Sequence, residues 1–171
     1  MLKNKILPTL VLSVICIVVA LLLAVANMVT APVIEAAQRE KEAAVMRQVY
    51  PEGESFEPVD VKKNKLPVSI TEAYTVNDGG FVFKSAVKGY KDGLVVMVGI
   101  SADGKIVHTK YVESNETNGA EDKLDGAYNG MSAENIEAVL VGGSTKTSVG
   151  YKNAVSDSLT AYGILTGGIV K

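Results

Sequence analysis

The chain has 171 residues, 47% of them hydrophobic, and its 17 basic and 19 acidic side chains give a net charge of −2. This length suits one modest domain, and the balanced charge gives no reason to expect a nucleic-acid partner. A single cysteine and a single histidine exclude a disulfide scaffold and a zinc or iron–sulfur centre built from these side chains.

The first predicted element is an apolar helix near the N-terminus. No charged residue occurs from Ile6 to Ile34, and the run Leu7–Ala31 exceeds the roughly 20 apolar residues that cross a bilayer. The sequence holds no second run of this kind, which excludes a polytopic membrane protein. Lys3 and Lys5 precede the run, so the positive-inside rule predicts a cytoplasmic N-terminus and an extracytoplasmic domain at the plasma membrane.

A cleaved signal peptide is the alternative interpretation of this segment. Ala24-Val25-Ala26 has the small–x–small pattern of a cleavage site. The apolar run continues past this tripeptide and is longer than the hydrophobic region of a usual signal peptide, which favours an uncleaved anchor. We therefore expect residues 1–34 to form a short cytoplasmic stub and a transmembrane helix.

Residues 35–67 are expected to form a helical stalk and a linker. Good helix formers dominate as far as Tyr50, where Pro51 disfavours a further helical residue. The polar stretch Glu52–Pro67 contains two prolines and predicts a connecting loop.

Residues 68–171 are predicted to form an α+β domain with a mainly antiparallel sheet and flanking helices. The continuous apolar run Gly93–Ile100 is typical of a buried strand, and Lys105–Glu113 alternates. The Asp103-Gly104 turn between them predicts a β-hairpin. Gly80–Lys88 alternates in part and predicts a further strand.

Two more helices are expected in the second half of this domain. Ser132–Val139 predicts a helix with Ser132 as its N-cap, and Ser148–Tyr162 has its apolar residues at helical spacing.

The segment that carries chemistry is Gly142-Gly143-Ser144-Thr145-Lys146-Thr147-Ser148, directly ahead of the last helix. Glycines let a backbone approach a ligand closely, and the unpaired amides at a helix N-terminus favour an anion such as phosphate. Lys146 adds positive charge. A glycine-rich turn with Ser and Thr capping is the alternative that the segment alone leaves open, and the GxxxxGK[ST] pattern of a P-loop does not occur.

This segment resembles the SGATxTS motif of the FMN-binding domains in the G subunit of Rnf electron-transport complexes and in the C subunit of the sodium-translocating NADH:quinone reductase. The resemblance implies FMN joined through its phosphate to the hydroxyl of Thr145. It also implies that Gly143, Ser144, Lys146 and Thr147 surround the attachment point.

The resemblance covers nearly the whole chain in the same order. Gly89-Tyr90 matches a glycine–tyrosine pair ahead of an apolar strand, and Asn153-Ala154-Val155 matches the core of the last helix. Glu116-Thr117-Asn118-Gly119 matches the ETPGLG loop near the flavin, which implies that Glu116 and Thr117 belong to the cofactor site. The seven tyrosines could stack on a flavin ring, although packing is the role expected of most of them; Tyr90 and Tyr128 flank the relevant loops.

The sequence departs from the family pattern at three places. Val139 stands where the family usually has an acidic residue six positions before the acceptor threonine. Gly142 and Ser144 stand where the motif has Ser or Thr and then Ala. The ETPGLG-like loop lacks its proline and its leucine–glycine end.

The resemblance implies a membrane-anchored flavoprotein subunit of an Rnf-like ferredoxin:NAD oxidoreductase. It would relay electrons through covalent FMN within a complex coupled to sodium or proton translocation, as one subunit rather than a stand-alone enzyme. The implied partners are other membrane subunits and the flavin transferase that matures the chain. Two alternatives are an anchored extracytoplasmic binding or assembly module that has lost the flavin, and an FMN carrier in another extracytoplasmic electron-transfer chain.

Overall fold

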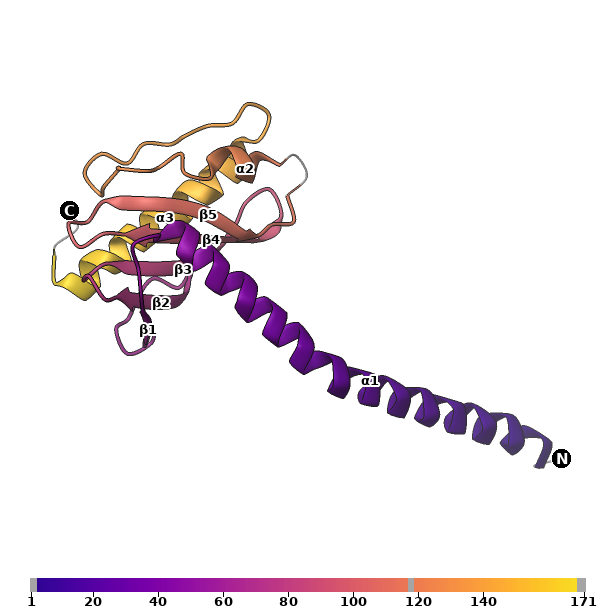
Figure 1. The fold of residues 1–171 in the computed structure, drawn as a ribbon. Coiled ribbons are helices and arrows are strands. Elements are labelled where there is room, and N and C mark those ends of the chain that lie inside the picture. The colour runs from indigo at the N-terminus through magenta and orange to yellow at the C-terminus, as the bar shows by residue number, and fades with distance from the viewer. Residues whose placement is uncertain (1–2, 117–118, 169–171) are drawn as a thin grey trace. The chain divides into compact units, whose positions relative to one another are not determined.

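The computed structural model describes residues 3–116 and 119–168 and contains two compact units, Met1–Lys41 and Glu42–Lys171. The described elements agree with the predicted α+β class, because an antiparallel sheet follows the N-terminal helix and carries helices at its flanks (Figure 1). In chain order they are α1 (Lys3–Val49), β1 (Phe56–Val59), β2 (Ile70–Val76), β3 (Phe81–Lys88), β4 (Asp92–Ile100), β5 (Ile106–Glu113), α2 (Ala120–Leu124) and α3 (Thr145–Thr166).

The first unit is the part of α1 that ends at Lys41. Within Leu10–Val49 this helix contains a window with a mean hydropathy of 2.9, and none of that window is buried against the rest of the chain. The helix is therefore long and apolar enough to cross a membrane, as the sequence predicts.

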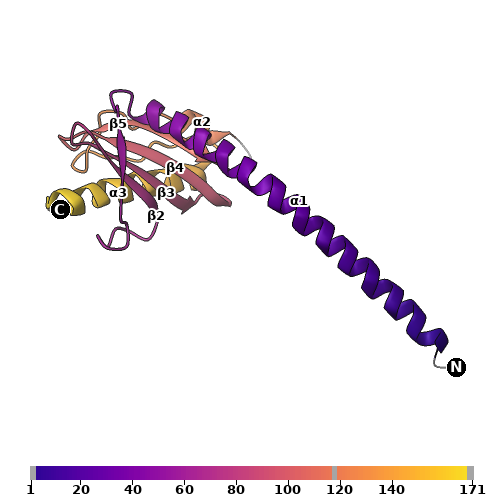
Figure 2. The same ribbon diagram turned by 60° about the horizontal axis from the view of Figure 1, so that its bottom comes forward.

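The second unit is built on a five-stranded antiparallel sheet whose strands lie in sequence order, β1-β2-β3-β4-β5. Figure 2 labels β2, β3, β4 and β5 of this sheet. The apolar run in β4 makes it the most buried strand, with Leu94, Val96 and Val98 all fully inaccessible. The predicted hairpin between β4 and β5 is confirmed: Gly104 has φ +81° and Ser101 N donates to Lys105 O at 2.9 Å.

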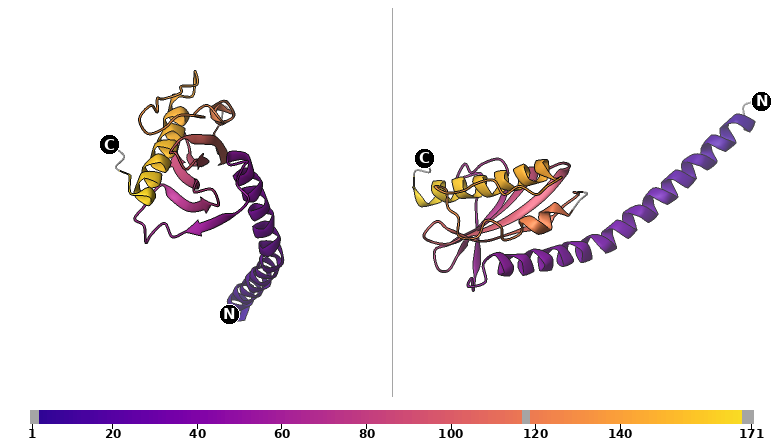
Figure 3. Two further views of the ribbon diagram at one scale, coloured as in Figure 1. Left: turned by 60° about the vertical axis from the view of Figure 1, so that its left-hand side comes forward. Right: turned by 90° about the horizontal axis from the view of Figure 1, so that it is seen from above.

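Side chains on a strand alternate between the two faces of a sheet, and here each face is covered by a helix. Phe83, Val96 and Val98 pack in one cluster with α3. Val82 and Met97 point to the other face and pack against the last turns of α1, which belong to this unit. Figure 3 shows the sheet between α3 and the C-terminal end of α1.

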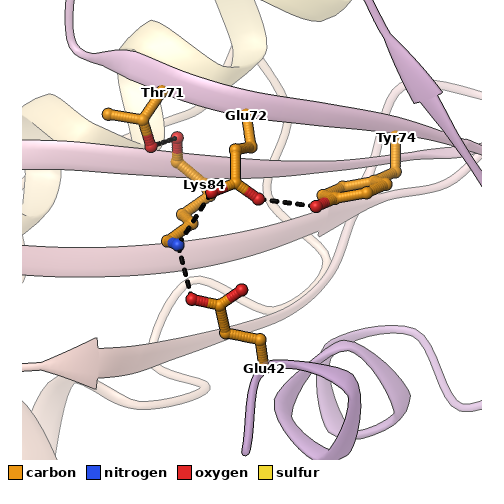
Figure 4. A network of polar contacts seen from close by, with 5 residues as sticks. All are labelled: Glu42, Thr71, Glu72, Tyr74 and Lys84. Atoms are coloured by element: carbon orange, nitrogen blue, oxygen red, sulfur yellow. Dashed lines mark hydrogen bonds and ion pairs between the residues drawn. The ribbon is translucent and has the colours of Figure 1, made fainter. Parts of the chain in front are cut away.

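Close backbone contact fixes the end of α1 on the sheet. A Cβ on Gly99 would lie 2.3 Å from the carbonyl oxygen of Val49, so only glycine allows this approach. A polar network adds to it: Lys84 Nζ contacts Glu42 Oε1 at 2.7 Å and Glu72 Oε1 at 2.9 Å, and Tyr74 donates to Glu72 (Figure 4).

The structure differs from the sequence prediction in several connecting segments, one of which forms the short helix α2, which the sequence does not predict. The predicted helix Ser132–Val139 is wrong: the segment is irregular, and Asn135 Oδ1 accepts the backbone N–H of Ser132 at 2.6 Å. The backbone N–H of Val139 lies 3.3 Å from the Tyr128 hydroxyl rather than in a helical bond. The predicted loop Glu52–Pro67 contains strand β1, which pairs with β2.

Candidate functional site

The motif Gly142–Ser148 forms a turn and the first turn of α3, which begins at Thr145 and not at the predicted Ser148. Ser144 N donates to Val141 O at 3.0 Å, and Gly143 has φ +80°, a conformation that glycine adopts without a steric cost. The buried Ser148 hydroxyl accepts from Val141 N at 3.0 Å and donates to Ser144 O at 3.0 Å. The turn is therefore fixed to the helix that it precedes.

The start of α3 offers backbone amides to an anion. The first helical hydrogen bond runs from Ser148 N to Ser144 O at 3.0 Å. The N–H groups of Thr145, Lys146 and Thr147 therefore have no acceptor within the helix, and the positive end of the helix dipole lies beside them. Among the described residues beyond its two chain neighbours, no atom lies within 4 Å of the place where a Cβ on Gly143 would stand, so a ligand can approach the backbone there.

A cavity of about 590 Å³ opens at this helix start. This volume falls within the range of pockets that bind cofactors and other small molecules. The cavity is lined by Tyr90, Glu116, Gly143, Ser144, Thr145, Lys146 and Thr147. Six of these are predicted cofactor-site residues, and Tyr90 is the seventh lining residue. The seventh predicted residue, Thr117, lies outside the described residues.

Glu116 joins three segments around the cavity. Its Oε2 accepts the Thr147 hydroxyl at 2.7 Å, and its Oε1 accepts the backbone N–H of Lys91 at 3.1 Å. Thr147 is buried, so its hydroxyl holds the Glu116 loop against α3. A Cβ on Gly89 would come within 2.3 Å of Glu116 Oε1, so the carboxylate would have to shift to make room for a side chain there.

Thr145 and Lys146 are the two exposed members of the motif that carry a polar side chain. Thr145 is the first residue of α3 and lines the cavity beside the helix amides. The Lys146 ammonium lies 5.6 Å from the centroid of the Tyr90 ring. The site thus combines an accessible hydroxyl, a positive charge on a long side chain and unpaired backbone donors, which together suit a phosphorylated ligand.

The motif around Thr145 does not by itself predict Tyr90 as a site residue. The signal for it is the Gly89-Tyr90 pair ahead of an apolar strand. Its place in the site depends on Gly150 of α3, where a Cβ would lie 2.6 Å from Lys88 O and 2.9 Å from Gly89 Cα. Within the described residues, no group of three or more His, Cys, Asp or Glu side chains is arranged to hold a metal ion.

Comparisons with known proteins agree with this geometry. The model of the FMN-binding domain matches residues 89–160, which include the whole described cavity lining, and the model of the RnfG N-terminal region matches residues 1–49.

Two curated relatives match along most of their length. The G subunit of the Na(+)-translocating ferredoxin:NAD(+) oxidoreductase complex of Acetobacterium woodii is 34% identical over 94% of this chain and 86% of its own. The G subunit of the proton-translocating ferredoxin:NAD(+) oxidoreductase complex of Clostridium ljungdahlii is 24% identical over 92% of this chain and 91% of its own. The chain therefore belongs to the family of G subunits of Rnf electron-transport complexes, which carry an FMN-binding domain.

Proposed function

We propose that this chain is the membrane-anchored flavoprotein subunit of an Rnf-type ferredoxin:NAD oxidoreductase complex, and that it relays electrons through FMN attached to Thr145. The observation that carries the proposal is the exposed residue Thr145 at the start of α3, which lines a cavity that the FMN-binding domain match covers. Electron transfer by such a subunit needs partners, and the partners we propose are the other membrane subunits of the complex.

The residues of the cavity fit FMN. The amides of Thr145, Lys146 and Thr147 and the Lys146 ammonium would hold the phosphate at the helix N-terminus. The carboxylate of Glu116 is the acidic group of the lining, and both its oxygens accept hydrogen bonds from Thr147 and Lys91. These bonds direct it toward the protein rather than toward a phosphate. When bound, FMN supplies the redox chemistry that the amino-acid side chains of this chain lack.

Covalent attachment requires an activated phosphoryl donor, because a hydroxyl does not displace water from a phosphate monoester unaided. We propose a flavin dinucleotide as the donor and a separate flavin transferase as the catalyst. The Thr145 oxygen would form a new P–O bond, the phosphoric anhydride bond of the dinucleotide would break, a nucleoside monophosphate would leave, and the hydroxyl proton would pass to solvent. The exposure of Thr145 supports access of the transferase to this hydroxyl.

The coupling ion belongs to the complex rather than to this subunit in our proposal. The two relatives carry names that specify different ions, sodium for one and protons for the other. The described part of this chain has one helix that could cross a membrane, and a lone helix provides no ion pathway. Lys3 and Lys5 ahead of the apolar run support a cytoplasmic N-terminus and an extracytoplasmic flavin domain.

Intact-mass measurement tests the proposal on the full chain, co-produced with a flavin transferase and purified in detergent. We expect the wild-type mass to exceed the polypeptide mass by that of FMN less one water. Thr145→Ala should abolish the addition, whereas Thr160→Ala, which removes an exposed hydroxyl from the same helix, should retain it. An unmodified wild-type chain would refute covalent attachment, and a modified Thr145→Ala chain would refute the assignment of Thr145.

A further inference from the structure

Six of the seven tyrosines have structural roles that separate them from the cavity. Tyr128 and Tyr151 are fully buried and stack on each other with ring centroids 6.0 Å apart. Three more donate their hydroxyls to fixed acceptors, namely Tyr50 to Asp78, Tyr74 to Glu72 and Tyr162 to Ala102 O. Tyr111 packs against the main core on β5.

Tyr90 differs from all of these, because its ring lines the cavity and its side chain is 61% exposed. A large aromatic side chain left this exposed contributes little to the core, so burial does not explain its place.

The fold nevertheless fixes the backbone that carries Tyr90. On one side, Gly150 of α3 lets the Lys88–Gly89 backbone come into direct contact with the helix. On the other side, Glu116 accepts the backbone N–H of Lys91 at 3.1 Å and the Thr147 hydroxyl at 2.7 Å. Residues on both sides of Tyr90 are thus tied to the first two turns of α3, which keeps the ring at the cavity without burying it.

The face of the Tyr90 ring is in contact with the Lys146 ammonium, which a ligand ring could displace. Lys146 Nζ lies 5.6 Å from the ring centroid, and both side chains are exposed. A cation–π contact at an exposed site is weak, about 0.5–1 kcal/mol in other proteins, so a flat conjugated ring can replace it. Because Lys146 directly follows Thr145, its ammonium would then be available to a phosphate on the Thr145 hydroxyl.

We propose that Tyr90 is the surface on which the isoalloxazine ring of FMN stacks, and that Lys146 leaves this ring to neutralise the phosphate at Thr145. This inference rests on the proposed function, since it assumes a flavin in the cavity. It makes Tyr90 a cofactor-binding residue and assigns the two ends of the cofactor to two neighbouring groups: the ring to Tyr90, and the phosphate to Thr145 and Lys146.

Flavin fluorescence tests the inference without any measurement of electron transfer. A tyrosine in contact with a flavin quenches its fluorescence by donating an electron to the excited ring, whereas phenylalanine and leucine do not. The experiment uses the full chain with its attached flavin, first folded and then unfolded in denaturant. We expect wild-type fluorescence to rise several-fold on unfolding, and Tyr90→Phe and Tyr90→Leu to be bright already when folded.

Visible circular dichroism of the flavin separates stacking from quenching. Tyr90→Phe keeps an aromatic face and should retain the wild-type signal, whereas Tyr90→Leu should lose most of it. Tyr162→Phe is the matched control, because it removes a tyrosine hydroxyl at a different cavity, near the end of α3, and should stay quenched. Should Tyr90→Leu fail to receive flavin, the fluorescence of Tyr90→Phe decides the question.

The possible results separate this inference from the proposed function. A folded Tyr90→Phe chain that carries flavin and is as strongly quenched as the wild type would overturn the role of Tyr90 and leave the proposed function intact. If the wild type carries no covalent flavin, free FMN is titrated into it as the probe. Quenching that depends on Tyr90 then supports the inference, and quenching that does not depend on it overturns it. No binding of FMN at all overturns the inference together with the proposed function.

Discussion

Gly143 determines the shape of the turn that places Thr145 at the start of α3. Its φ of +80° lies in the left-handed region, where a Cβ is unfavourable, although no atom of the described residues beyond its chain neighbours would lie within 4 Å of that Cβ. A Cβ on Gly142 would likewise have no such atom within 4 Å, but Gly142 has no positive φ, so the two neighbours have similar room for a Cβ and different backbone conformations. They therefore allow a matched test of whether this turn needs glycine for its backbone or for room.

We expect Gly143→Ala to lower the free energy of unfolding by about 1–2 kcal/mol, the usual cost of a left-handed conformation for a residue with a Cβ. Gly142→Ala should change it by less than about 0.5 kcal/mol. Urea unfolding of the full chain in mild detergent, followed by circular dichroism, measures both. Equal losses in the two variants would show that the turn does not depend on the backbone conformation of Gly143.

At the scale of whole elements, the network around Lys84 links three parts of the second unit (Figure 4). It brings Glu42 of α1 and Glu72 of β2 to one ammonium on β3, with the Lys84 side chain 13% exposed. Burial alone would raise the pKa of Glu72, but hydrogen bonds from Tyr74 and Lys84 and the charge of Lys84 outweigh it and hold that pKa below its ordinary value of 4.5. For the Lys84 ammonium, burial alone would lower the pKa, but the hydrogen bonds and charges of Glu42 and Glu72 outweigh burial and raise that pKa.

We expect Lys84→Met to cost roughly 1–3 kcal/mol at neutral pH, because two partly buried carboxylates lose a charged donor. The pH dependence of this stabilisation follows from Glu72, whose pKa is lower in the folded state than in the unfolded chain. The stabilisation is therefore fully present above pH 4.5 and is lost as the pH falls through the folded-state pKa. The difference between wild type and Lys84→Met should therefore shrink on acidification. Urea unfolding from pH 7 to pH 3 measures it, with Lys105→Met, which breaks an exposed pair with Asp103, as the control. A difference that stays constant over this range would contradict the assignment.

The elements that the sequence predicts well are those whose signals are local. The β4–β5 hairpin follows from an apolar run, a turn at Asp103-Gly104 and an alternating run, which all lie within the segment itself. The sequence does not predict strand β1, because the segment contains Pro58 and forms a strand only by pairing with β2. The helix predicted at Ser132–Val139 is wrong because side-chain oxygens of Asn135 and Tyr128 accept hydrogen bonds from backbone amides of this segment.

The candidate site shows the same division. The motif around Thr145 could be found from residue types alone, because glycines, hydroxyls and a lysine stand together before a helix. That the helix begins at Thr145 depends on the Ser148 hydroxyl, which bonds to Val141 and Ser144. The contribution of Tyr90 depends on contact between Gly150 and the Lys88–Gly89 backbone, which lie far apart in the sequence.

At the scale of the whole molecule, the boundary between the two units falls within a helix and not in a loop. α1 is continuous from Lys3 to Val49, whereas the second unit begins at Glu42. The last turns of α1 therefore belong to the core of the second unit: Val45, Met46 and Val49 cover Val82 and Met97 on the sheet. This segment is thus a structural part of the flavin-binding unit as well as the continuation of the apolar helix.

The boundary predicts how the chain tolerates truncation. Residues 42–171 should form a soluble, cooperatively folded domain, because every described side chain that covers the sheet is retained. Residues 52–171 lack Val45, Met46 and Val49, and each fully buried side chain of this kind contributes about 1.5–3 kcal/mol. The shorter fragment also loses the ion pair between Lys84 and Glu42. Because a domain has only about 5–15 kcal/mol of stability, the shorter fragment should unfold or aggregate. Soluble yield and urea midpoints compare the two fragments; equal midpoints would show that the end of α1 is dispensable to the domain.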